Sequence, residues 1–258
     1  HAVHRQDVKA LCQWAGSLAL PSSHTTWFNF LASHDGIGLN PLRGILPESE
    51  ILSLVENLQQ EGALVNWKNN PDGTRSPYEI NVTYLDALSL QDSSDEERIA
   101  RFLLAHAVLL SFPGVPAVYI QSILGSRNDY EGVERLGYNR AINRKKYTAG
   151  QLGSELNNKK SIRYQIYSRL SEFIAIRRGE RAFHPDSQAA FDAVGKQILK
   201  IIRVAENGER ITALFNFSNK MQTVYEQTLS GKELLSGQDI SGTELILNPW
   251  QVMWINEN

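Results

Sequence analysis

The chain has 258 residues, of which 42% are hydrophobic and 21% charged, a composition typical of a soluble globular protein. Its 26 basic and 28 acidic residues give a net charge of -2, which excludes a whole-chain basic surface for nucleic acid or for a membrane. One cysteine, Cys12, excludes an internal disulfide framework and fits a reducing compartment. The chain begins at His1 without a signal peptide, so we expect part of a longer cytoplasmic protein.

The first 182 residues alternate between strand-like and helix-like segments. Residues 1–16 resemble the end of an amphipathic helix. Segment 25–32 is rich in aromatic and β-branched residues, and its weak alternation predicts a strand buried on both faces. Helical spacing or capping then predicts helices near 48–58, 94–112 and 161–178, with a second apolar strand at 115–120. This order is typical of parallel βα units.

Two stretches interrupt this pattern. Residues 61–77 are polar and contain the turn sequence Asn70-Pro71-Asp72-Gly73, which predicts a long loop with a functional role. Residues 121–160 are also irregular.

The pattern changes after residue 182. Segments 197–205, 211–218, 223–229 and 245–255 have strand-like composition and are separated by turns that contain glycine. We therefore predict an α/β domain over 1–182 and a small all-β sandwich domain over 183–258.

The strongest candidate for chemistry is the pair His34 and Asp35. It follows directly after the predicted strand 25–32, and catalytic groups in α/β barrels sit at the carboxyl ends of strands. The alternative is a loop aspartate that caps a nearby backbone group.

Two other regions contain possible binding residues. Segment 127–146 has six basic residues against three acidic ones and would attract an anionic substrate, although a solvated loop has the same composition. In the predicted loop and just after it, aromatic faces and charged groups suited to sugars and anions are supplied by Trp67, Arg75, Tyr78 and Glu79. The histidines show no convincing ligand spacing and no glycine-rich phosphate loop is present, so we expect neither a metal nor a cofactor.

Segments 29–38, 112–119 and 139–144 together resemble glycoside hydrolase family 13, and more narrowly its sucrose phosphorylase branch. Segments 71–74 and 76–84 look closest to the glucosylglycerate phosphorylases of that branch. The resemblance covers the whole chain. It implies the last βα units of a (β/α)8 TIM barrel followed by a small all-β C-terminal domain, which is the C-terminal half of such an enzyme.

The resemblance also implies roles for individual residues. Asp35 would be the catalytic carboxylate that stabilises the transition state, and His34 would hydrogen-bond the same sugar. Arg140, beside Asn139, would contact the far hydroxyls of the glucosyl unit. Tyr78 would lie in the mobile loop that meets phosphate and acceptor. Arg75 is a candidate donor for phosphate or for an acidic acceptor.

The implied reaction is retaining phosphorolysis, in which inorganic phosphate releases α-glucose 1-phosphate from an α-glucoside such as glucosylglycerate or sucrose. In this family the nucleophile and the general acid precede the His-Asp pair, and nothing before residue 34 supplies them. We therefore expect the chain to be inactive without the N-terminal half of the barrel as its partner. The alternatives are a non-catalytic carbohydrate-binding or structural fragment, and a family 13 hydrolase or transglucosidase.

Overall fold

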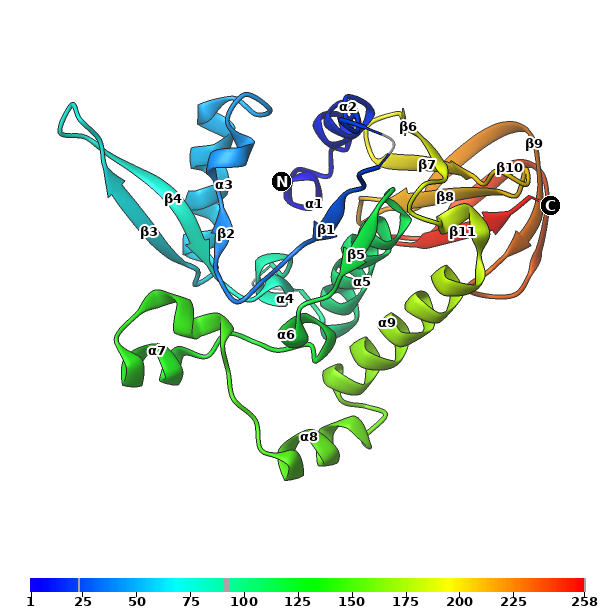
Figure 1. Cartoon of the computed structure of the whole chain (residues 1–258). Helices are drawn as coiled ribbons and strands as arrows, with labels where there is room; N and C mark the ends of the chain where they lie inside the picture. The colour runs from blue at the N-terminus through cyan, green and yellow to red at the C-terminus, as the bar shows by residue number, and fades with distance from the viewer. Residues whose placement is uncertain (23, 91–92, 258) are drawn as a thin grey trace. The chain divides into compact units, whose positions relative to one another are not determined.

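The computed structural model describes residues 1–22, 24–90 and 93–257 (Figure 1). The described residues contain the short 3₁₀ turns η1 (Asn40–Leu42), η2 (Asn139–Asn143) and η3 (Arg181–Phe183). In chain order the helices and strands are α1 (Ala2–Arg5), α2 (Lys9–Gly16), β1 (Phe28–Phe30), β2 (Ile37–Gly38), α3 (Glu48–Gln60), β3 (Leu64–Asn69), β4 (Arg75–Asn81), α4 (Tyr84–Ala87), α5 (Asp95–Ser111), β5 (Val115–Ala117), α6 (Ile120–Ile123), α7 (Tyr130–Leu136), α8 (Ala149–Leu156), α9 (Ile162–Gly179), β6 (Gln188–Val194), β7 (Ile198–Val204), β8 (Arg210–Asn216), β9 (Gln222–Glu233), β10 (Asp239–Leu247) and β11 (Val252–Asn256).

The chain forms two compact units. The first comprises His1–Asn29, Leu103–Ala117 and Arg169–Asn258, and the second comprises Phe30–Phe102 and Val118–Ser168. Helices α5 and α9 contribute residues to both. The predicted boundary at residue 182 remains a prediction. No helix in the described ranges is both long enough and apolar enough to cross a membrane.

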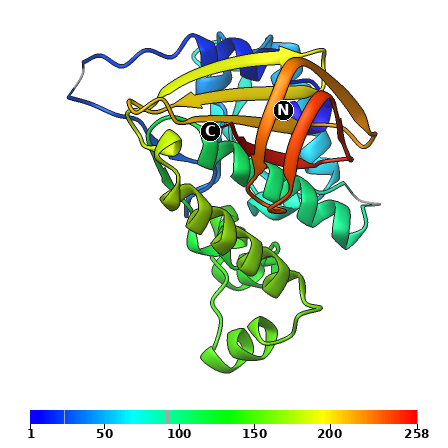
Figure 2. The same ribbon diagram turned by 90° about the vertical axis from the view of Figure 1, so that its right-hand side faces the viewer.

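A six-stranded antiparallel sheet dominates the first unit, in the order β10-β9-β11-β8-β7-β6. The strands curl strongly, so that one face encloses an apolar core (Figure 2). Leu214, Val224 and Ile255 lie in that core and are fully or almost fully buried. Beyond it, the buried ring of Trp254 packs against Phe173 and Phe183, with ring centroids 5.3 and 5.0 Å apart. The predicted all-β unit therefore exists.

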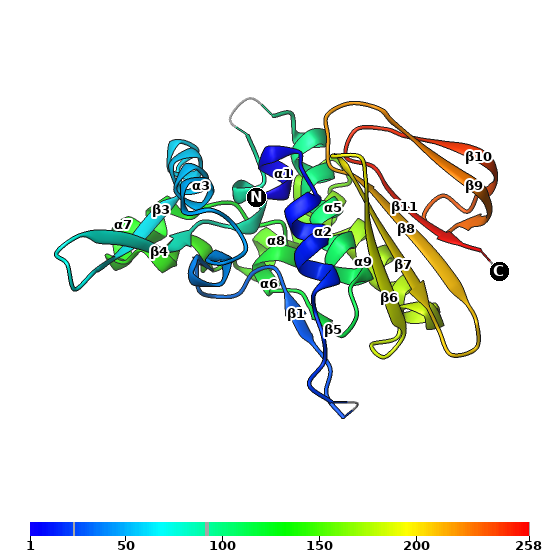
Figure 3. The same ribbon diagram turned by 90° about the horizontal axis from the view of Figure 1, so that it is seen from above.

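Two details of this sheet differ from the sequence prediction. The predicted strand 245–255 is wrong as a single strand, because the chain turns between β10 and β11. In that turn Trp250 takes a φ of 56°, and its N–H donates to the Ser218 carbonyl at 3.1 Å. Strand β6 was not predicted; it pairs with β7 and packs against α2 (Figure 3).

Two buried arginines hold the C-terminal end of α5. The guanidinium of Arg177 donates to the carbonyls of Leu110 and Gly114, and that of Arg203 donates to the Ser111 carbonyl at 2.9 Å. Carbonyls at a helix C-terminus have no partner within the helix and carry partial negative charge. The two cations therefore satisfy groups that burial would otherwise leave unpaired.

In the second unit β2, β4 and β3 form a three-stranded antiparallel sheet. Strands β3 and β4 make an extended hairpin (Figure 1), so the prediction of a long loop over 61–77 is wrong. Asp72 closes the tip, where its Oδ1 accepts the Thr74 N–H at 3.0 Å. Backbone pairing between β3 and β4 forms this hairpin, and the polar residues around its turn hid it from a hydrophobic-pattern analysis.

Strands β1 and β5 pair in a two-stranded sheet. Each strand has three residues. The prediction that they are buried on both faces is wrong, because Phe28 is 67% exposed and Val115 is 44% exposed. A sheet of two strands offers few neighbours to cover its side chains.

Candidate active site

Asp35 lies in the segment between β1 and β2, where two arginines from the η2 region meet its carboxylate. Arg140 Nη1 lies 2.7 Å from Asp35 Oδ1, and Arg144 Nη2 lies 3.3 Å from the same oxygen. His34 Nε2 is 3.7 Å from that oxygen. The Asp35 side chain remains 40% exposed, so this carboxylate is fixed by its partners and still accessible to a ligand.

Side chains near η2 also hold the backbone around Asp35. Asn143 Nδ2 donates to the Ser33 carbonyl at 2.7 Å and to the Asp35 carbonyl at 3.3 Å. Arg144 Nε donates to the intervening His34 carbonyl at 2.7 Å. Three consecutive carbonyls are thus anchored to one short segment.

Glu79 on β4 forms a second anchor for Arg140. Arg140 Nε donates to Glu79 Oε2 at 3.2 Å, and Arg140 Nη2 lies 2.9 Å from Glu79 Oε1. This two-point contact matches the fork of a guanidinium to a carboxylate. The hydrogen bond that Arg140 donates to Glu79, followed by attraction to Glu79 and Asp35, raises the pKa of Arg140 despite an opposing effect of burial.

The turn after Asp35 approaches β4 closely enough to require glycine. A Cβ atom on Gly36 would lie 2.6 Å from the Glu79 Cγ and 2.6 Å from the Ile80 carbonyl oxygen. Instead, the Gly36 N–H donates to Glu79 Oε1 at 3.1 Å. The glycine therefore allows the turn that follows Asp35 to lie directly against Glu79.

The structure brings together most of the predicted site residues. His34, Asp35 and Arg140 are in direct contact or adjacent, and Tyr78 is close enough to contribute to the raised pKa of Arg140. Asn139 supports the cluster indirectly.

Arg75 is the exception, because it lies at the opposite end of β4, paired with Asn69 at the hairpin tip. Four residues along a strand separate it from Glu79 by about 13 Å. A role for Arg75 stays a prediction.

Sequence analysis missed two residues of the cluster, Asn66 and Asn143, and treated Glu79 only as a possible substrate contact. Asn66 Nδ2 donates to Glu79 Oε2 at 2.7 Å and its Oδ1 accepts from Asn139 Nδ2 at 2.8 Å. The signal available in advance was the position of Glu79 between Tyr78 and Ile80, since a carboxylate within an apolar segment needs partners if it is buried. Within the described ranges, no group of three or more His, Cys, Asp or Glu side chains could hold a metal ion.

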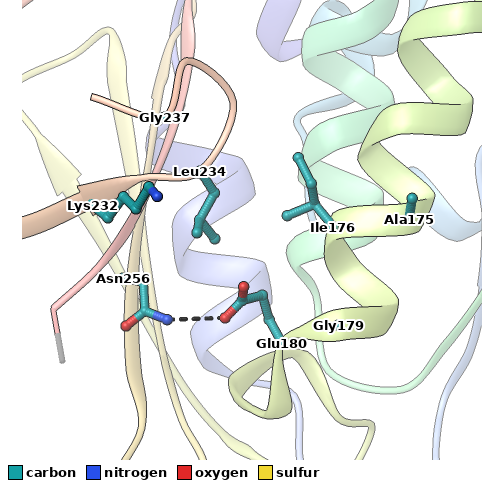
Figure 4. Close-up of a pocket in the computed structure, with 8 residues that line it drawn as sticks. All are labelled: Ala175, Ile176, Gly179, Glu180, Lys232, Leu234, Gly237 and Asn256. Carbon is teal, nitrogen blue, oxygen red and sulfur yellow. Dashed lines mark hydrogen bonds between the residues drawn. The ribbon is translucent and has the colours of Figure 1, made fainter. Parts of the chain in front are cut away.

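A separate hollow of about 530 Å³ lies in the first unit, between the end of α9 and strands β9 and β11 (Figure 4). Glu180 faces Asn256 across it, and Asn256 Nδ2 donates to Glu180 Oε2 at 2.9 Å. Burial raises the pKa of Glu180. The hollow is also lined by Lys232, Leu234 and Ile176.

Comparison with solved structures defines the class of fold. The structure superimposes on a sucrose 6F-phosphate phosphorylase from Thermoanaerobacter thermosaccharolyticum with a TM-score of 0.70 and 20% identity, over 94% of this chain and 45% of that one. The predicted architecture, the C-terminal part of a TIM barrel followed by an all-β domain, is therefore confirmed.

Sequence comparison is more specific. No family model matches the chain. It is 65% identical over 255 residues to the glucosylglycerate phosphorylase of Escherichia coli K12, covering 99% of this chain and 46% of that protein. It is 39% identical to the glucosylglycerate phosphorylase of Allomeiothermus silvanus, covering 99% of this chain and 45% of that protein. The resemblance to the sucrose phosphorylase branch is thus confirmed, and the chain spans about half the length of the curated relatives it matches.

Proposed function

We propose that this chain is the C-terminal part of a retaining α-glucoside phosphorylase and that glucosylglycerate is the substrate of the complete enzyme. The 65% identity to a glucosylglycerate phosphorylase along almost the whole chain carries this proposal. Sucrose is the alternative glucoside, since sucrose phosphorylases match at 28% identity.

Asp35 is the residue of this chain that stabilises the transition state. Cleavage of a glycosidic bond passes through a transition state with positive charge on the sugar ring. A carboxylate held by Arg140 and Arg144, and still 40% exposed, is preorganised to stabilise that charge and to accept hydrogen bonds from sugar hydroxyls. His34, whose side chain is 68% exposed, contacts the same sugar.

Phosphate must approach a site that contains several carboxylates, so cationic donors are needed nearby. Arg140 and Arg144 supply positive charge beside Asp35, and Tyr78 supplies a phenol. Arg75, at the tip of the β3–β4 hairpin, is a candidate donor for the acceptor or for phosphate.

The nucleophile and the general acid come from a part of the enzyme outside this chain, namely the preceding strands of the barrel. The exposure of Phe28 and Val115 on the two-stranded sheet of β1 and β5 supports this partner, because further strands would cover them. The isolated chain is accordingly inactive.

A chimaera tests the proposal. The chain replaces the matching 255 residues of the E. coli glucosylglycerate phosphorylase, and folding is checked by circular dichroism. The folded chimaera should release α-glucose 1-phosphate from glucosylglycerate only when phosphate is present, and the chain alone should release none. Free glucose as the product would instead indicate a hydrolase, and a folded chimaera without turnover on either glucoside would overturn the proposal.

A further inference from the structure

We propose that Asn128 is a positioning residue that fixes the base of the β3–β4 hairpin; its expected effect on turnover rests on the function proposed above. Asn128 lies in the segment 127–130, which leads into α7. The hairpin brings Glu79 and Tyr78 next to Arg140. The placement of the hairpin therefore sets the position of both side chains relative to that arginine.

Asn128 holds the chain where it leaves β4. Its Oδ1 accepts the Thr83 N–H at 2.8 Å, and Thr83 is almost fully buried. Two further bonds close a ring, because the Asn128 N–H donates to Asp86 Oδ2 at 2.7 Å and the Asp86 N–H donates to Thr83 Oγ1 at 3.4 Å. Asp86 also accepts from Arg127 Nε. These bonds join the start of α4, which directly follows the hairpin, to the segment 127–130.

The same asparagine reaches the other end of the hairpin through Tyr130. Asn128 Nδ2 donates to the Tyr130 hydroxyl at 3.1 Å, and that hydroxyl donates at 3.0 Å to the carbonyl of Gly62, which lies just before β3. Gly62 takes a φ of 96°, and a Cβ atom there would collide with the Tyr130 oxygen. The oxygen of the Asn128 side chain is thus bonded to one end of the hairpin, and its nitrogen is linked through Tyr130 to the other.

The segment 127–130 is also bonded to η2, the turn that carries Arg140. The Asp129 N–H donates to the carbonyl of Ile142 at 2.9 Å, and Ile142 is fully buried. Strands β3 and β4 both contact η2. Bonds at consecutive residues therefore join the hairpin and the turn with Arg140 to one short segment. Loss of the Asn128 side chain should release the hairpin from this segment and leave η2 in place.

Hydrogen exchange of backbone amides in the chain itself tests this role without an assay of activity. Asn128→Ala removes both side-chain bonds, and Tyr130→Phe removes only those of the hydroxyl. Asn57→Ala on α3 and Tyr167→Phe on α9 are the matched controls, since both residues are exposed. The amides that pair β3 with β4 next to the hairpin base should exchange about tenfold faster in Asn128→Ala, because they open by local unfolding. Tyr130→Phe should show a smaller increase in the same amides, and the controls none.

The amides of β7 and β8 separate local release from a general loss of stability. They should exchange at the same rate in Asn128→Ala and in the unchanged chain, whereas a general loss of stability would accelerate them together with those of the hairpin. Unchanged exchange in β3 and β4, or equal acceleration in all four strands, would overturn the proposal. If Asn128→Ala does not fold, Tyr130→Phe is judged by the same comparison.

The chimaera described above tests the consequence for turnover. Asn128→Ala should lower kcat for phosphorolysis about 100-fold, since a misplacement of about 1 Å has that cost. Because the Asn128 amide and the Tyr130 hydroxyl belong to one hydrogen-bonded chain, adding Tyr130→Phe to Asn128→Ala should cause little further loss. Additive losses, or an Asn128→Ala variant as active as Asn57→Ala, would overturn the proposal. A folded chimaera without any turnover contradicts the proposed function instead, and hydrogen exchange then decides the role of Asn128.

Discussion

The Asp35 cluster and the curled β-sheet are stabilised in opposite ways. The sheet encloses its own apolar core, where Leu214, Val224 and Ile255 are 0% exposed. The Asp35 cluster is a network of ion pairs and amide hydrogen bonds whose central carboxylate remains 40% exposed. A core of this kind contributes mainly to folding stability, whereas an open ionic network contributes little to stability and keeps charged groups accessible. Substitutions in the Asp35 cluster should therefore mainly change the rate of phosphorolysis, whereas substitutions in the curled sheet should mainly change the free energy of unfolding.

The largest expected effect is on activity, from Asp35→Asn. Loss of the negative charge removes transition-state stabilisation and should lower kcat of the chimaera about 1,000-fold. The melting temperature should change little, because Asp35 is partly exposed. Steady-state phosphorolysis and thermal melting measure the two quantities. Asp72→Asn at the hairpin tip is the control, and near-normal turnover by Asp35→Asn would remove this residue from the active site.

The largest expected effect on stability comes from Arg203→Met in the first unit. Arg203 is 0% exposed and donates to the carbonyls of Ser111, His184, Ser187 and Gln188. Leaving buried acceptors unpaired should lower the free energy of unfolding by about 3–5 kcal/mol. Urea denaturation measures this loss. Arg169→Met, which removes an exposed ion pair with Glu172, should cost less than about 1 kcal/mol; equal losses would contradict the account.

A smaller effect, from Gly36→Ala, should appear in both the free energy of unfolding and the rate of phosphorolysis. Gly36→Ala would force a Cβ atom against Glu79 and the Ile80 carbonyl, and should cost about 1–3 kcal/mol in stability while lowering kcat. Gly38→Ala is the control, since no atom lies within 4 Å of its Cβ position. Urea denaturation and phosphorolysis of both variants would test this, and identical behaviour of the two alanines would argue against the close approach at Gly36.

The smallest expected effect concerns the pH dependence of stability. Because burial raises the pKa of Glu180 in the folded state, the folded protein binds this proton more tightly than the unfolded chain, and the stability contributed by Glu180 increases as pH falls. Glu180→Gln can still accept from Asn256 and has no charge to bury. Its melting temperature should equal or exceed that of the wild type at pH 7, and the difference should shrink towards pH 4. A difference that grows with acidification would contradict this assignment.

Local signals were sufficient to predict several helices. The helix predicted over 94–112 has a serine cap at its start, where the Glu97 N–H donates to Ser94 Oγ at 3.1 Å. The helix predicted over 48–58 is present as α3, which begins directly after Pro47. In these cases the residues that determine the structure lie within a few positions of one another.

The features that sequence analysis missed depend on distant partners. Glu79 contacts Gly36 and Arg140, which lie 43 and 61 residues away in the chain. Strand β4 also pairs with β2, where Ile37 lies opposite Ile80, 43 residues further along the chain. The His-Asp pair was recognisable from its position after a strand, but its partners Asn143 and Arg144 required the fold.

The most direct test of the central claim is a phosphorus-31 NMR time course of the folded chimaera and its Asp35→Asn variant with glucosylglycerate and inorganic phosphate. The chimaera should give a growing signal of α-glucose 1-phosphate, and the variant should give almost none over the same period. Equal rates of α-glucose 1-phosphate formation by the two proteins would contradict it.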